Sequence, residues 1–406
     1  MRQHAILWIT PKWPLPINDG ARVATKALLD PVSRHCPVTL LALAGEDEIV
    51  DLAAIKKVYP HLANVRVLVR PAWKNHRDRL KMALRATFNI MSTPLTFLRF
   101  LVPDLSRGIA AICHEEKPSA IVCDGLHPGA TFVKIPQARP EHTPLIYRAH
   151  NAEHRLWEQM ADQAGHAIRR IFLQHQANLM RRWERQFLSI ATATTCVAPE
   201  DLEIFRNWLG TDKQLAHIPI GLQFRSLPFD ANSPLRLLFL GRLDWPPNRE
   251  GLEWFLAEVW ARIKRDDIVL AIAGSGDSQW LERWRGLRQL EILGEVPDPT
   301  LCYERAHAAI APIFWGSGTR VKTIEPAAFN RACIATSAAI RGAPLSDREI
   351  ILADTAEEWL NVIDGLTMDQ LSEYASRSRE RLQPIFDQEI VAKKFLTFLH
   401  ELRPDF

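Results

Sequence analysis

The sequence contains no apolar run long enough to cross a lipid bilayer. A membrane-spanning helix needs roughly 20 consecutive apolar residues, and no stretch of the 406 residues approaches that length. The first apolar run, Ala5 to Ile9, is also too short for a signal peptide and is typical of a buried strand. We therefore expect a cytoplasmic chain whose contact with the inner face of the membrane, where it occurs, is peripheral.

Closely spaced cysteines are also missing. The chain has six cysteines, mostly within apolar runs, and none of them shows the close pairing of a zinc site or a disulfide framework. We expect buried thiols in a reducing compartment. The six are Cys36, Cys113, Cys123, Cys196, Cys302 and Cys333.

The chain has no strong charge of either sign. Its formal net charge is +3, which is too small to indicate a nucleic-acid partner without a local basic patch. Residues 66–107 are the exception. This segment contains nine lysines and arginines but only two acidic residues, Asp78 and Asp104, and its basic residues are interspersed with apolar ones such as Phe97 and Phe100. This segment is a candidate for peripheral contact with an anionic membrane or acceptor, and the alternative is an ordinary solvated basic face.

Short apolar runs alternate with segments of helical spacing, which predicts an α/β fold with parallel sheets covered on both faces. A chain of this length is too long for one core and suits two domains. The turn-forming stretch from Leu227 to Pro234 is the best linker. We expect domains at 1–228 and 229–385, and a last apolar helix in 386–406 that could pack back on the first domain.

One stretch of helical spacing is unusually long, from about residue 151 to residue 189. It is rich in arginine and glutamine on one side, and we expect its large apolar side chains to face inward. These are Trp157, Ile171, Phe172, Leu179, Trp183 and Phe187.

The strongest local pattern is a strand, a glycine loop and a helix, in the run from Ala308 to Phe329. The two glycines of the loop, Gly316 and Gly318, let the backbone approach a ligand closely, and a helix N-terminus attracts an anion such as phosphate. Lys322 in the first turn could place a charge on that anion, and Glu325 could accept hydrogen bonds from a diol such as ribose. The alternative is a capped helix in which Lys322 and Glu325 simply pair.

A second approach to phosphate follows the strand from Leu235 to Leu240. There a glycine is followed by a cation, in Gly241 and Arg242. In the first half, Gly20 ends the first strand-to-helix loop and His150 follows a strand directly, so both lie where an open parallel sheet binds ligands. A turn glycine and a structural histidine are the plain alternatives for these two residues.

These residues carry a resemblance to a known family. The stretches from Leu238 to Asn248 and from Gly316 to Thr336 resemble the donor domain of family-4-type glycosyltransferases, most of all the bacterial branch that builds surface polysaccharides. The first half is similar in two places, the proline-rich loop that ends at Gly20 and the run from His150 to Glu153. The resemblance covers nearly the whole chain. It implies a GT-B arrangement, in which two Rossmann-like domains face each other across a cleft.

The resemblance implies transfer of a sugar, with retention, from a nucleotide diphosphate sugar such as a UDP- or GDP-sugar to a glycan or lipid-linked acceptor. By position, Arg242 and Lys322 would hold the diphosphate, Thr319 and neighbouring amides would support it, and Glu325 would bind the ribose. The glycines of the donor loops would be Gly241, Gly316 and Gly318.

In the other domain, the resemblance implies that Gly20 lets the backbone reach the donor phosphates and that His150 touches the transferred sugar. We therefore name His150, Arg242 and Lys322 as the catalytic residues. The sequence departs from the family at Ser317, where many members have a second glutamate, and in the stretch from Trp245 to Arg249, which lacks the usual lysine.

The chemistry needs cations more than it needs a strong base. Cleavage of a glycosyl phosphate leaves negative charge on the diphosphate, so groups that bind this charge more tightly in the transition state lower the barrier. The sequence has no Asp-x-Asp motif, and we expect neither a metal nor another cofactor, because Arg242 and Lys322 would replace it. Two alternatives stay open, a nucleotide-sugar epimerase of the same fold and a non-catalytic partner subunit with Ser317 in place of the glutamate.

Overall fold

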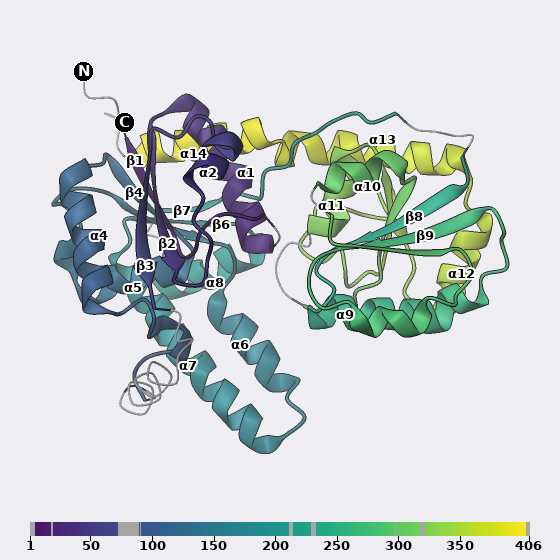
Figure 1. Cartoon of the computed structure of the whole chain (residues 1–406), viewed down its shortest axis with the longest axis horizontal. Helices are drawn as coiled ribbons and strands as arrows, with labels where there is room; N and C mark the ends of the chain where they lie inside the picture. Colours follow the sequence, from purple (N-terminus) through teal and green to yellow (C-terminus); the bar gives the residue numbers. More distant parts are fainter. Residues whose placement is uncertain are drawn as a thin grey trace. The chain divides into compact units, whose positions relative to one another are not determined.

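The chain forms two compact units in the computed structural model (Figure 1). The first contains Met1–Pro219 and Val391–Phe406, and the second contains Ile220–Ile390. Each unit is built on a parallel sheet with helices on both faces, as the alternation of strands and helices predicts. The structure describes residues 5–17, 19–71, 89, 91–210, 214–228, 233–296, 298–316 and 321–402.

The sheet of the first unit has seven strands in the order β3-β2-β1-β4-β5-β6-β7, all parallel. Its central strands are buried on both faces, which is why they are continuous apolar runs rather than alternating ones. The strands are β1 (Ile6–Thr10), β2 (Val38–Gly45), β3 (Asn64–Arg70), β4 (Ala120–Asp124), β5 (Leu145–Ala149), β6 (Ala193–Cys196) and β7 (Gln214–His217).

Two apolar cores cover the two faces of this sheet. Leu7 and Ile9 of β1 point into one core, and Ile6 and Trp8 point into the other. The second core includes Phe395, whose ring centroid lies 5.7 Å from that of Trp8. The helices of this unit are α1 (Gly20–His35), α2 (Leu52–Val58), α4 (Pro103–Glu116), α5 (Leu126–Lys134), α6 (Glu153–Asp162), α7 (Ala167–Ile190), α8 (Pro199–Leu209) and α14 (Gln388–Leu402).

The sheet of the second unit has six strands in the order β10-β9-β8-β11-β12-β13. The strands are β8 (Leu235–Leu240), β9 (Ile268–Ala273), β10 (Leu290–Gly294), β11 (Ala308–Ala311), β12 (Ala332–Ala335) and β13 (Ile351–Leu352). The helices are α9 (Pro246–Trp254), α10 (Pro299–Arg305), α11 (Val321–Ala328), α12 (Ala356–Gly365) and α13 (Met368–Phe386), with a π-helical turn at Phe255–Val259.

Both sheets have a topological switch point next to their first strand. From β8 the chain proceeds outward through β9 and β10, and then returns to β11 on the other side of β8. The first unit does the same around β1 and β4. Ligands of open α/β sheets bind beyond the carboxyl ends of the two strands that flank such a point. The loops after β8 and β11, and those after β1 and β4, are therefore the places to examine.

The units divide at Pro219, earlier than the expected boundary at 228. The reason is that the intervening segment is bonded to the second unit. Leu222 forms an isolated bridge with Asp387, and the backbone nitrogen of Arg225 donates to the oxygen of Ala328 at 2.7 Å. The last residues, from Val391, belong to the first unit, where Phe395 and its neighbours in α14 complete a core.

The single long helix expected over residues 151–189 is wrong. A turn that contains Gly165 separates α6 from α7, and the two helices lie side by side as a hairpin (Figure 1). The prediction that Ile171 and Phe172 face inward is also wrong, because these residues are 70% and 38% exposed. Helical spacing alone cannot tell which face of a helix meets a partner.

The basic segment 66–107 is described only in part, since residues 72–88 and 90 lie outside the described residues. In the described part, Phe97 and Phe100 are 0% and 5% exposed and belong to the core of the first unit. These two rings therefore cannot form the apolar face of a membrane contact. Among the described helices, none is both long and apolar enough to span a bilayer.

Candidate functional site

The candidate site of the second unit lies at its switch point, where the loops after β8 and β11 come into contact. Gly241 follows β8, and Lys322 lies in the first turn of α11, the helix after β11. A methyl group placed on Gly241 would lie 2.7 Å from Nζ of Lys322. The absence of a side chain at Gly241 therefore creates the space in which the ammonium group lies.

Lys322 is held in place by two neighbours from the β8 side of the site. Its Nζ donates to Oδ1 of Asn248 at 2.9 Å and lies 4.2 Å from the ring centroid of Phe239. Asn248 is buried, and its Nδ2 donates to the backbone oxygen of Arg242 at 2.7 Å. The lysine, the asparagine and the Gly241-Arg242 loop thus form one connected group, which fixes a positive charge beside the N-terminus of α11.

The side chain of Arg242 forms a two-pronged ion pair with a residue of its own loop. Its Nε and Nη2 lie 2.6 Å and 3.0 Å from the two carboxylate oxygens of Asp244. Hydrogen bonding to Arg242 lowers the pKa of Asp244, although burial of the carboxylate acts in the opposite direction. The Arg242 side chain is 54% exposed, so a diphosphate could reach it, but the diphosphate would have to share the guanidinium with Asp244 or displace the carboxylate.

The Gly274–Gly276 loop after β9 packs against the Gly241-Arg242 loop and Asp244. The backbone nitrogen of Leu243 donates to the oxygen of Ser275 at 2.7 Å. Gly276 has a φ of +92°, and a methyl group there would lie 2.3 Å from Oδ1 of Asp244. The two glycines of this loop therefore serve close packing against the Gly241-Arg242 loop.

We expect Gly274→Ala to destabilise the second unit by about 3 kcal/mol, since overpacking typically costs 1–3 and occasionally more. The new methyl group would lie 1.7 Å from the backbone oxygen of Gly241, and Gly274 has a φ of +154°. Thermal unfolding measures the loss. Gly286→Ala is the matched control, because a methyl group at Gly286 meets nothing within 4 Å. Equal melting temperatures for both variants would contradict the expectation.

Glu325 lies one turn after Lys322 on α11, as the sequence predicts, and is partly buried. Its Oε2 accepts a hydrogen bond from the hydroxyl of Tyr303 at 3.0 Å, and the Tyr303 ring stacks on Phe329. Burial raises the pKa of Glu325 to about 6, against the opposing effects of the Tyr303 hydroxyl and the Lys322 charge. The carboxylate is therefore mostly ionised at neutral pH and able to accept hydrogen bonds.

Of four further residues named from the sequence, Gly316 and Gly20 can be placed. Gly316 follows β11 with a φ of +127°, a backbone conformation that favours glycine. Gly318 and Thr319 lie outside the described residues, together with Ser317 and Arg320, so their expected roles stay predictions. Gly20 is the first residue of α1, it is exposed, and a methyl group there would meet nothing within 4 Å.

In the first unit, His150 lies directly after β5 and is bonded to Asp124 at the end of β4. Its Nε2 is 2.5 Å from Oδ1 of Asp124 and 2.6 Å from Nη1 of Arg148. The other oxygen of Asp124 accepts from Nε1 of Trp8 and from the hydroxyl of Thr25, at 3.1 Å and 2.6 Å. His150 is thus fixed at the switch point of the first sheet through one nitrogen, and its expected contact with the transferred sugar stays a prediction.

The sequence reasoning did not find Asp124, although it occupies the centre of this group. Asp124 is fully buried, and the favourable charges of Arg148 and His150 and the hydrogen bonds outweigh burial and lower its pKa well below the usual range. The available signal was a carboxylate directly after an apolar strand. Asn248 was also missed as a partner of Lys322, since its role depends on a contact 74 residues along the chain.

A buried acidic cluster lies beside this group and also escaped the sequence reasoning. Glu184 of α7 accepts from the hydroxyl of Tyr147 at 3.1 Å, from the backbone nitrogen of Glu153 at 3.0 Å, and pairs with His154 at 2.7 Å. Burial, together with the charges of Glu184 and Asp201, raises the pKa of Glu153 to about 8. Burial also raises the pKa of Asp201 to about 6.

This cluster predicts that the first unit loses stability as the pH rises. Because the pKa of Glu153 is raised from its ordinary value of 4.5 to about 8, the folded state binds more protons than the unfolded state between these two pH values. We expect Glu153→Gln to gain stability relative to the wild type by roughly 3 kcal/mol between pH 5 and pH 8. Urea unfolding of both proteins across this range measures the difference. A difference independent of pH would contradict the expectation.

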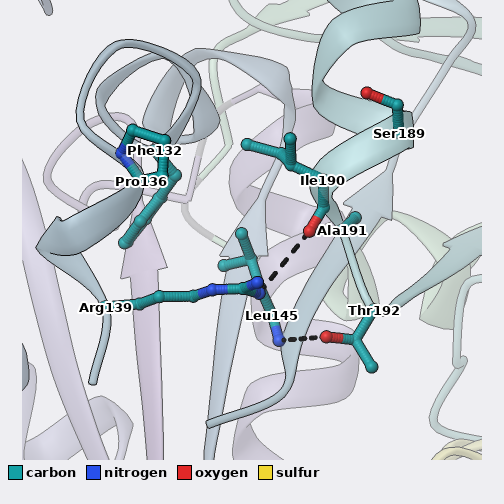
Figure 2. Close-up of a pocket in the computed structure, with 8 residues that line it drawn as sticks. All are labelled: Phe132, Pro136, Arg139, Leu145, Ser189, Ile190, Ala191 and Thr192. Atoms are coloured by element: carbon teal, nitrogen blue, oxygen red, sulfur yellow. Dashed lines mark hydrogen bonds between the residues drawn. The ribbon is translucent and has the colours of Figure 1, made fainter. Parts of the chain in front are cut away.

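The first unit also contains a cavity of about 340 Å³, shown in Figure 2. It lies where β5 begins and α7 ends, at the amino edge of the sheet, whereas parallel sheets bind ligands at the carboxyl edge. The backbone nitrogen of Leu145 donates to the hydroxyl of Thr192 at 3.0 Å, so polar groups there are bonded internally. We therefore assign it no chemistry. It is lined by Phe132, Pro136, Arg139, Leu145, Ser189, Ile190, Ala191 and Thr192.

Comparison with known proteins gives a family match within the second unit. Residues 234–369 match the family model described as Glycosyl transferases group 1. Residues 234–369 are therefore similar to group 1 glycosyltransferases. The matched residues include the Gly241-Arg242 loop, Lys322 and Glu325, so the residues assembled at the switch point lie within the similar part of the chain.

The whole chain has the GT-B fold of solved glycosyltransferase structures. It superimposes on sucrose-phosphate synthase from Thermosynechococcus elongatus with a TM-score of 0.70 at 16% identity, over 100% of both chains. It superimposes on Anabaena HepE in complex with UDP-glucose with a TM-score of 0.64 at 15% identity, over 98% of this chain and 99% of that one. The two parallel-sheet units expected from the sequence are thus confirmed.

A sequence relative extends the similarity beyond the family domain. An uncharacterised 44.6 kDa protein in the cps region of Klebsiella pneumoniae is 24% identical over 351 residues. The match covers 83% of this chain and 84% of that protein. The two proteins are therefore similar along most of their length, including the first unit.

Proposed function

We propose that this chain transfers a sugar, with retention, from a nucleotide diphosphate sugar to a glycan or glycolipid acceptor during the synthesis of a cell-surface polysaccharide. The group 1 family of residues 234–369 supports sugar transfer. The cps-region relative supports the polysaccharide context. A solved structure of similar fold is bound to UDP-glucose, which favours a UDP-sugar over a GDP-sugar as donor.

One observation carries the choice of donor. Lys322 places its ammonium group against Gly241, beside the first turn of α11, and Glu325 follows one turn further on. A positive charge at a helix N-terminus suits a diphosphate, and a carboxylate one turn away suits the two hydroxyls of a ribose. The site therefore has the order of groups that a nucleotide diphosphate presents.

The chemistry follows from where charge develops. When the bond between the sugar and the diphosphate breaks, the bonding electrons stay with the diphosphate, which gains negative charge. Lys322 is already fixed by Asn248, so it can stabilise this charge without reorganising. Arg242 adds a second cation once the diphosphate competes with Asp244. In this proposal the two cations take the place of a divalent metal, and no other cofactor is involved.

The first unit would then supply the acceptor side. His150, fixed by Asp124 through Nε2, would present the rest of its ring to the transferred sugar, and Gly20 would leave room for the backbone to approach the donor phosphates. We place the protein in the cytoplasm, where nucleotide sugars are made, with its acceptor at the inner face of the membrane.

Isothermal titration with UDP-glucose and GDP-mannose tests the proposal. We expect the wild type to bind one of the two and Lys322→Met to bind at least about tenfold more weakly, because it loses a charge-assisted contact with the diphosphate. Lys264→Met is the matched control, since Lys264 is an exposed lysine of the same unit. If neither nucleotide sugar binds, or if Lys322→Met binds as tightly as the wild type, the proposal is wrong.

The ribose contact predicts a dependence of binding on pH. Because burial raises the pKa of Glu325 to about 6, the carboxylate becomes protonated as the pH falls from 7 to 5 and accepts ribose hydroxyls less well. We expect nucleotide affinity to fall by about tenfold over this range in the wild type, as a carboxylate hydrogen bond is worth 1.5–3 kcal/mol. Glu325→Gln should bind the nucleotide sugar weakly, and its affinity should change less with pH. Titrations of both proteins at pH 5, 6 and 7 measure the affinities, and the same pH dependence in the variant and the wild type would contradict the expectation.

A further inference from the structure

The tip of the hairpin formed by α6 and α7 carries large apolar side chains that face solvent. In the first two turns of α7, Ile168 is 85% exposed, Ile171 is 70% exposed and Phe172 is 38% exposed. Isoleucine and phenylalanine are among the residues most often buried. Three of them within five positions are therefore a feature of the surface that needs an explanation.

The three side chains form a stripe along the helix. Positions 168, 171 and 172 have the i, i+3, i+4 spacing that places residues on one face. A different face of α7 packs against α6, where Leu173 joins Ala161 and Ala164 in a small core of the hairpin. The hairpin is thus stabilised by its own contacts, and the exposed stripe remains available.

The charges around the stripe are mostly positive. The 21 residues from 163 to 183 contain four arginines and two histidines and no acidic residue. The exposed Asp162, which ends α6, is the nearest acidic residue in the chain. Arg169 and Arg170 lie between Ile168 and Ile171 in the chain and are exposed. Arg170 donates one hydrogen bond to the backbone oxygen of Ala164 at 3.3 Å, which anchors the side chain at the tip.

We propose that the tip of the α6–α7 hairpin, residues 163–172, docks this protein on an anionic lipid surface. The apolar stripe would enter the boundary between headgroups and acyl chains, and the two arginines would lie at the level of the lipid phosphates. The hairpin projects from the body of the first unit (Figure 1). This contact differs from the one expected in residues 66–107 and does not depend on the nucleotide sugar.

A second copy of the chain fits this surface less well. Two tips that met by their apolar stripes would bring Arg169 and Arg170 of both copies together, and like charges disfavour such an interface. An anionic bilayer offers an apolar interior for the three exposed side chains and negative charge for the two arginines. The charge pattern therefore selects the membrane over the dimer.

Flotation with lipid vesicles tests the proposal. The full chain is mixed with vesicles of phosphatidylglycerol and phosphatidylcholine in equal parts, or of phosphatidylcholine alone. We expect the wild type to bind the anionic vesicles and not the neutral ones. The variant Ile168→Gln, Ile171→Gln, Phe172→Gln should bind at least about tenfold more weakly, as should Arg169→Ala, Arg170→Ala at moderate salt.

A matched control removes three exposed apolar side chains elsewhere, at Ile49, Leu52 and Leu301, which are 87%, 52% and 52% exposed. We expect this glutamine variant to bind as the wild type does, and all variants to keep the wild-type melting temperature. Failure of the wild type to bind anionic vesicles would overturn the proposal, as would undiminished binding by the hairpin variant. Light scattering that shows a dimer in the wild type and a monomer in the hairpin variant would also overturn it, because a second copy would then cover the stripe.

Discussion

Asp124→Asn is expected to lower the free energy of unfolding of the first unit by about 3 to 5 kcal/mol, the usual cost of breaking a buried ion pair. Asp124 and Arg148 are 0% and 1% exposed, and Nη1 of Arg148 lies 2.6 Å from the carboxylate. An asparagine leaves the guanidinium charge without a counter-charge. Both carboxylate oxygens of Asp124 accept hydrogen bonds. The amide nitrogen of the asparagine would therefore face a donor whichever of the two oxygens it replaced.

Native-state hydrogen exchange of peptides from β1, β4 and β5 measures this loss, because it reports on the first unit separately from the second. Glu203→Gln in α8 is the matched control. Glu203 also pairs with an arginine, Arg206, but its side chain is 62% exposed, so the change should stay below about 1 kcal/mol. Replacing both buried partners, as in Asp124→Asn with Arg148→Met, should restore part of the stability. Equal protection in Asp124→Asn and the wild type would contradict the argument.

The pH dependence of this contribution has a definite sign. Since the pKa of Asp124 is lowered from its ordinary value of 3.8, the stabilisation is present above pH 3.8 and is lost only as the pH falls below it. The contribution of the acidic cluster around Glu153 depends on pH in the opposite direction. Because the pKa of Glu153 is raised, stability is lost as the pH rises. The wild type should therefore be most stable in mildly acidic solution, where Asp124 is ionised and Glu153 is still protonated.

Strand positions and the donor loops could be predicted because they depend on local sequence. A buried parallel strand is an apolar run of a few residues, and the strand, glycine loop and helix around Lys322 follow one another along the chain. The helix expected around Lys322 is α11 (Val321–Ala328), and Lys322 and Glu325 lie one turn apart on it, as their spacing predicts.

The features that could not be predicted depend on distant partners. Asp124 bonds to Trp8 and Thr25, which are 116 and 99 residues away in the chain. The outward direction of Ile171 and Phe172 depends on where α6 ends and on which face of α7 it then covers. Periodicity shows that a helix has an apolar face, but only the packing shows whether a neighbour lies against it.

Lys322→Met is expected to lower kcat by about 100- to 1000-fold, the usual loss when one preorganised group that stabilises developing charge is removed. Methionine keeps much of the apolar stem and removes the ammonium group together with its contact to the Phe239 ring. Release of the nucleoside diphosphate, UDP or GDP, from the nucleotide sugar that the wild type binds measures the rate. Lys264→Met should leave kcat unchanged, and a Lys322→Met enzyme within about threefold of the wild type would be incompatible with a role in stabilising charge.

The competing explanation is that Lys322 only holds the loop after β8 in place through Asn248. Asn248→Leu separates the two explanations, because it removes the hydrogen bond to Nζ at 2.9 Å and the one to Arg242 at 2.7 Å but leaves the ammonium charge. If the charge itself stabilises the leaving diphosphate, Asn248→Leu should lower kcat far less than Lys322→Met does, while lowering the melting temperature more. If Lys322 acts only through the loop, the order of the two kcat values should reverse.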